Sequence, residues 1–154
     1  MGGIVRLRRT TVRLQSYSLS AITVLRIGLR AVATEMEVVL PKNKVIEYAE
    51  WQVILTQIAI RIKEIGQQPA GKKKDLMLAY YNSTALRLNA LKDIFRNQTM
   101  HVRHLFDREE ALEAIEQTNK LMEKIGFYTY DGMSGPIDWD RELRLEEEYE
   151  AGNY

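Results

Sequence analysis

The stretch that decides the fold covers residues 87–108 and reads RLNALKDIFRNQTMHVRHLFDR. Its first half carries apolar residues three and four positions apart, which is the spacing of one helix face: Leu88, Leu91 and Phe95. Near its end, Asp107 is a good helix N-cap, and Glu110 completes a capping box in which Asp takes the place of Ser or Thr. The stretch therefore predicts a junction between two helices.

The same spacing, followed outward from the junction, predicts four helices and no strand. Their expected bounds are about Ser18–Met36, Val45–Ile65, Lys72–Phe95 and Asp107–Gly126. Isoleucines recur on one face of the second helix: Ile54, Ile58, Ile62 and Ile65. The buried stripe of the fourth helix is expected to consist of Leu112, Ile115, Met122 and Ile125. Four amphipathic helices with short connections indicate an all-α helical bundle.

The domain organisation that follows is one bundle with two extensions of opposite charge. Residues 1–17 form a basic N-terminal extension, residues 18–126 the helical domain, and residues 127–154 a turn-rich segment with an acidic tail. The tail is expected to hold a short helix or no fixed structure, with Trp139 docking it onto the bundle. Of Tyr80 and Tyr81, one is expected in the core and one at the surface.

Composition narrows the class of protein. The 154 residues include no cysteine, which excludes disulfides, thiolate catalysis and cysteine zinc sites, and fits a cytoplasmic location. The most apolar stretch, residues 19–40, is interrupted by four charged side chains, so we expect no membrane span. The phosphate-binding loop, nucleophile-elbow and His-Glu-x-x-His patterns are missing from the sequence.

Cations gather at the junction between the third and fourth helices, and we expect no cofactor there. The basic and polar residues concerned are Arg87, Lys92, Arg96, Asn97, His101, Arg103, His104 and Arg108, against which stand only Asp93 and Asp107. A patch of this charge favours binding of the phosphate groups of RNA. His101 and His104, three positions apart, could bind a metal from one helix face, but a surface role is the favoured interpretation and no metal is expected.

Arginine and histidine together suffice for one reaction without a metal. Arginine offers a fixed planar fork to phosphate oxygens, and histidine has an ordinary pKa of about 6.5, suited to proton transfer. Histidine can deprotonate a ribose 2′-hydroxyl or protonate the leaving oxygen, while arginine stabilises the charge that grows on phosphorus. The spacing alone is equally compatible with a structural role, in which the cations cap the third helix at its carboxyl end.

The local string resembles the HEPN-domain family. Leu91 to Arg103, LKDIFRNQTMHVR, is similar to family strings of the type Lys-Asp-x-x-Arg-Asn-x-x-Met-His-x-Arg that precede an Asp-capped last helix. The resemblance implies a four-helix domain that forms a homodimer, with two Arg-x4-His motifs facing one cleft. Many members are metal-independent ribonucleases that act as toxins or antiviral effectors, and others are inactive scaffolds.

The resemblance also assigns roles to individual residues. It implies that Arg96 stabilises the transition state, His101 transfers the proton and Asn97 orients the phosphate or the histidine. We expect the neighbouring RNA contacts to come from Lys92, Arg103, His104 and Arg108. The toxin–antitoxin branch carries a tyrosine two residues after the histidine, where this chain has Arg103.

The leading hypothesis is therefore a ribonuclease of a toxin or phage-defence system, with an antitoxin or other regulatory protein as a possible partner. The first alternative is a non-catalytic module of the same family that binds RNA or a protein partner through the same patch. The second alternative is a structural bundle in which the motif only caps a helix.

Overall fold

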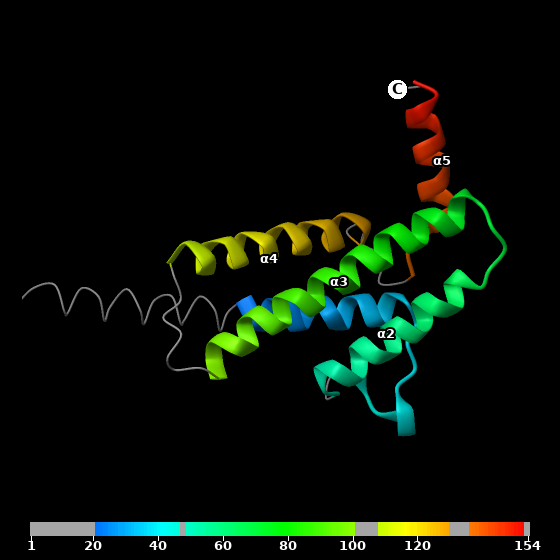
Figure 1. Ribbon diagram of the computed structural model, residues 1–154. Coiled ribbons are helices and arrows are strands. Elements are labelled where there is room, and N and C mark those ends of the chain that lie inside the picture. The colour runs from blue at the N-terminus through cyan, green and yellow to red at the C-terminus, as the bar shows by residue number, and fades with distance from the viewer. Residues whose placement is uncertain (1–20, 47–48, 101–107, 130–135, 153–154) are drawn as a thin grey trace, which may run out of the picture.

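The computed structural model describes residues 21–46, 49–100, 108–129 and 136–152, and within these ranges it is all-helical, with no strand. Residues 21–35 are helical, and a short 3-10 turn, η1, follows at Pro41–Asn43. The labelled helices in Figure 1 are α2 (Trp51–Gly66), α3 (Lys72–Met100), α4 (Arg108–Thr129) and α5 (Trp139–Glu150).

Helix α3 is the centre of the architecture, because α2, α4 and α5 all pack against it. In Figure 1, α3 runs diagonally between α4 and α2, with the helix of residues 21–35 alongside and α5 projecting from the far end. The face of α3 turned to the core is apolar apart from one threonine: Tyr80, Tyr81, Thr84, Leu88, Leu91 and Phe95. The predicted isoleucine face of α2 is confirmed, with Ile54, Ile58 and Ile65 fully buried and Ile62 partly buried against the core.

Gly28 lets the first helix approach α4 closely. A Cβ atom at this position would lie 2.7 Å from the Sδ atom of Met122 and 3.5 Å from Ile125. Any larger residue would therefore have to displace Met122 before the two helices could pack as they do.

The first helix ends in a left-handed turn at a residue other than glycine. Glu37 has φ 55°, its N–H donates to Thr34 at 3.1 Å, and the Val38 N–H donates to the carbonyl of Ala33 at 3.0 Å. These two bonds make a Schellman motif, which satisfies carbonyls that the helix leaves unpaired. Val38 is buried, as the hydrophobic contact of that motif requires.

Three predicted helix boundaries are wrong. Helix α2 begins at Trp51, not near Val45, because the η1 turn and the extended backbone at Glu50 precede it. Helix α3 continues past Phe95 to Met100, since the polar residues that follow still allow helical geometry. Helix α4 runs through Gly126 to Thr129, so this glycine does not end it. Asp107, the predicted N-cap of α4, lies outside the described residues.

The predicted buried stripe of α4 is confirmed in part: Ile125 is buried, and Ile115 and Met122 are partly buried against the core. Leu112 is wrong, because it is 49% exposed and the buried positions in the first half of the helix hold smaller residues, Ala111, Ala114 and Thr118. Thr118 fits the core because its hydroxyl donates to the Ala114 carbonyl at 2.8 Å. Small side chains at these positions allow α4 to pack close to its neighbours, whereas the size of Leu112 favoured the wrong face.

The acidic tail forms a helix, the first of the two expected alternatives, and it docks through Trp139 as predicted. Trp139 is 6% exposed, and its ring lies 5.6 Å from that of Tyr80 and 5.5 Å from that of Tyr81. Both tyrosines are buried, so the expectation that one of them lies at the surface is wrong. The ring of Trp139 packs against both tyrosine rings and covers this face of α3, so that neither tyrosine is exposed.

Candidate functional site

The predicted motif lies at the end of α3 and beyond it. The backbone of Arg96 and Asn97 belongs to the last turns of α3, and Arg108 is the first residue of α4. His101, Arg103 and His104 lie outside the described residues. Their predicted roles therefore stay predictions.

A contact in the middle of the bundle sets the register of α3 against α4. Lys124 on α4 donates from Nζ to Oγ of Ser83 on α3 at 3.0 Å, and the two helices run in opposite directions (Figure 1). Arg96 on α3 and Ala111 on α4 are then equally far from this contact, about 20 Å at 1.5 Å per residue. The carboxyl end of α3 and the amino end of α4 therefore lie at the same end of the molecule.

Lys92 is the one predicted RNA-contacting residue whose side chain the structure describes. Its ammonium donates to Oε1 of Gln52 at 3.0 Å and lies 3.6 Å from a carboxylate oxygen of Asp93. The side chain is only 14% exposed. In this structure Lys92 joins α3 to the start of α2, and RNA would have to compete with these contacts.

A second cation, Lys124 on α4, is half-buried against α3. The Nζ atom of Lys124 lies 5.6 Å from the ring centre of Tyr80, in addition to its bond to Ser83. Burial lowers the pKa of Lys124, and the nearby charge of Arg87 lowers it further. Lys124 thus joins α3 to α4 through an aromatic ring and a hydroxyl.

The sequence reasoning missed a buried polar cluster against the amino-terminal half of α3, away from the motif. Glu35 is 7% exposed and accepts hydrogen bonds from the Tyr81 hydroxyl, at 2.7 and 2.9 Å, and from the Ile137 backbone N–H, at 2.9 Å. The indole Nε1 of Trp139 donates to the Tyr81 hydroxyl at 3.1 Å. We call Glu35, Tyr81, Ile137 and Trp139 the tail anchor, because these bonds tie the tail to the first helix and to α3.

The electrostatics of the tail anchor follow from burial. Burial raises the pKa of Glu35 above its ordinary value of 4.5, although the bonds from Ile137 and Tyr81 act in the opposite direction. Burial, together with the charge of Glu35, also raises the pKa of Tyr81. The hydrogen bonds of the tail anchor join three segments of the chain, so its role is structural.

A signal for Glu35 was present in the sequence. The buried stripe of the first helix includes Ala21, Leu25, Gly28 and Val32, and the next position on it is Glu35. An acid on an otherwise apolar stripe indicates a buried carboxylate with a specific partner.

Comparisons with known proteins leave the family open. No protein-family model, no curated protein and no solved structure matches this chain. In the part of the chain that the structure describes, no helix combines the length and apolar character needed to cross a bilayer. No three His, Cys, Asp or Glu side chains of the described ranges are grouped so that they could hold a metal ion.

Proposed function

We propose that this protein is a metal-independent endoribonuclease of the HEPN type, acting in a toxin or antiviral defence system. The observation that carries the proposal is the register of α3 and α4. Arg96 and Asn97 in the last turns of α3 share one end of the molecule with Arg108 at the start of α4. A phosphate at that end would meet several cations and polar groups that are separated in sequence.

The proposed reaction transfers the phosphoryl group within the RNA. The ribose 2′-oxygen attacks phosphorus, the bond from phosphorus to the 5′-oxygen breaks, and a cyclic phosphate remains on the upstream fragment. The proton leaves the 2′-hydroxyl for one His101 imidazole, and the leaving 5′-oxygen receives a proton from a second imidazole, so that protons balance. Arg96 stabilises the charge on the phosphoryl oxygens, and Asn97 orients the phosphate.

A homodimer would supply the two imidazoles, and exposed apolar side chains support this part of the proposal. Ile27 of the first helix is 56% exposed, Val24 is 37% exposed, and Leu112 of α4 is 49% exposed. The register places Leu112 one position from Ala111, level with the motif. Leu112 is thus exposed near the motif, and an exposed apolar side chain there is compatible with a second copy packing at this end.

The test is RNA cleavage by the purified full chain in the presence of EDTA. We expect the wild-type chain to cut a single-stranded RNA, and His101→Ala and Arg96→Ala each to lower the rate at least 100-fold, the usual range for loss of a general acid–base or charge-stabilising group. Lys63→Ala, on the exposed surface of α2 and outside the motif, is the control and should retain the rate of the wild type. RNA that is bound in a salt-dependent way but left intact would support the non-catalytic alternative, and equal rates for His101→Ala and the wild type would contradict the proposal.

A further inference from the structure

Two cations and a hydroxyl meet at the seam between α3 and α4. Lys124 of α4 donates from Nζ to Oγ of Ser83 at 3.0 Å, and Arg87 follows Ser83 by one helical turn on the same side of α3. Side chains at this spacing have Cβ atoms about 5–6 Å apart. The charge of Arg87 acts on the lysine strongly enough to lower its pKa. We call Ser83, Arg87 and Lys124 the seam cluster.

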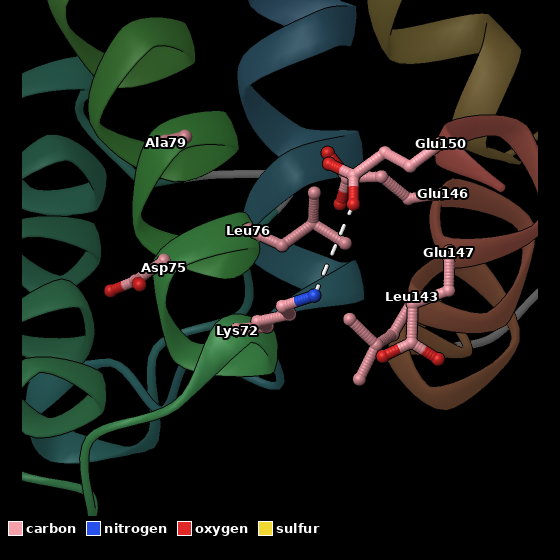
Figure 2. Close-up of a pocket in the computed structure, with 8 residues that line it drawn as sticks. All are labelled: Lys72, Asp75, Leu76, Ala79, Leu143, Glu146, Glu147 and Glu150. Carbon is pink, nitrogen blue, oxygen red and sulfur yellow. Dashed lines mark ion pairs between the residues drawn. The ribbon is translucent and has the colours of Figure 1, made fainter.

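The positive charge of the seam cluster is not compensated within the described ranges, where neither cation has an ion pair. Other lysines of the same two helices do have acidic partners. Lys72 of α3 lies 3.9 Å from Glu150 of α5, the pair that Figure 2 marks with a dashed line. Lys120, one turn before Lys124 on α4, lies 3.4 Å from Glu116. The seam cluster is therefore unlike its surroundings.

Two like charges held close together favour an anion between them. They repel each other at short range, and Lys124 has also lost part of its hydration, because its side chain is half-buried. Hydrogen-bond donors remain available as well. Arg87 is exposed and has no hydrogen bond in the described part of the chain, and Ser83 only accepts, so its own hydrogen is free to donate. An oxyanion beside Ser83 would meet donors from two helices.

We propose that the seam cluster binds a phosphate group of the RNA strand at a distance from the scissile bond. This inference rests on the proposed function. Phosphate oxygens match the planar fork of an arginine and the point charge of a lysine. Asn97 of the motif follows Arg87 by ten positions, which is about 15 Å along α3. At a rise of about 3.4 Å per nucleotide in a stacked strand, the cluster holds a phosphate about four nucleotides from the motif.

Cleavage of a long and a short RNA by the full chain tests this placement. The long substrate is a single strand of about 12 nucleotides, which exceeds the span to the cluster on either side of a central scissile bond. The short substrate is a dinucleotide. Arg87→Gln should raise KM for the long strand about fivefold or more and leave kcat within about twofold, because a remote contact adds uniform binding. With the dinucleotide, both constants should equal those of the wild type.

Binding of the long strand separates this inference from the proposed function, because it is measured in a His101→Ala background that is not required to cut RNA. Adding Arg87→Gln and Lys124→Gln together should make the slope of log Kd against log salt shallower by about 0.7, the value for one lost phosphate contact on a single strand. Lys63→Gln, on the exposed surface of α2, is the matched loss of one charge and should change neither KM nor the slope.

The outcomes distinguish the two claims. A chain that binds RNA with the predicted change of slope but never cuts it supports the seam cluster and contradicts the ribonuclease. A chain that cuts RNA with the same KM and slope in the variants as in the wild type overturns the seam cluster alone. An equal loss with the dinucleotide would place Arg87 at the scissile phosphate, and an equal loss in Lys63→Gln would show that only net charge matters. Either result would overturn the inference.

Discussion

Docking of the tail depends on the hydroxyl of Tyr81, because this one group donates a hydrogen bond to Glu35 and accepts another from Trp139. Tyr81→Phe keeps the ring and removes both bonds. We expect the free energy of unfolding to fall by about 1–3 kcal/mol, the cost of leaving buried polar groups without a partner. Urea denaturation measures the change. Tyr149→Phe, at a position 67% exposed, is the control and should change stability by less than about 0.5 kcal/mol.

Glu35 makes stability depend on pH in a direction that its burial fixes. The folded chain holds the Glu35 proton to a higher pH than the unfolded chain, because burial raises its pKa. In that window the folded state binds more protons, so the free energy of unfolding falls as pH rises. The Glu35→Gln variant cannot ionise at this position, so its free energy of unfolding does not fall with rising pH for this reason. We therefore expect the stability of the wild type relative to Glu35→Gln to decline as pH rises above about 4.5, and parallel pH profiles would contradict this account.

Within a single element, the end of the first helix holds a strained residue whose replacement should stabilise the fold. Glu37 occupies the left-handed position of the Schellman motif, which glycine fills without a steric penalty. Glu37→Gly should raise the free energy of unfolding by about 1 kcal/mol, and it also removes a charge that raises the pKa of Glu35. Glu113→Gly, inside α4, should lower it by about 1 kcal/mol. Thermal unfolding of the two variants checks whether the same substitution has opposite effects.

Helix α4 offers a second pair of substitutions with opposite expectations. Leu112 is exposed and Ala114 is 4% exposed. Leu112→Ala should leave the stability of the isolated protomer within about 0.5 kcal/mol of the wild type. Ala114→Leu should cost about 1–3 kcal/mol, because a closely packed position has no room for a larger side chain. A large loss of stability from Leu112→Ala in the monomer would show that Leu112 belongs to the buried stripe.

The elements differ in how far the sequence could predict them. The period of the isoleucines in α2 gave the correct face, because large apolar residues alternate there with polar ones. In the first half of α4 the buried positions hold alanine and threonine, so hydrophobicity alone favoured Leu112. The end of α3 was set too early, since Asn97, Gln98 and Thr99 interrupt the apolar stripe without breaking the helix. Apolar periodicity predicts where a helix packs better than where it ends.

At the scale of the whole molecule, α3 joins two ends of different chemistry. One end holds the Arg96 motif and the start of α4, and the other holds the tail anchor. The motif could be found from sequence because its residues are adjacent in the chain. The tail anchor could not, because it joins Glu35 to Tyr81 and Ile137 across long sequence separations.

The central claim is that the chain cuts RNA by attack of the ribose 2′-hydroxyl, and one comparison of substrates tests it most directly. The purified chain in EDTA is given a single-stranded RNA and the same strand with a single 2′-deoxyribose at the cleavage site. We predict that the RNA is cut to leave a 2′,3′-cyclic phosphate, and that the deoxy strand is bound with similar affinity and stays intact at that position. Cleavage of both strands at the same site, or binding of both without cleavage of either, would contradict the claim.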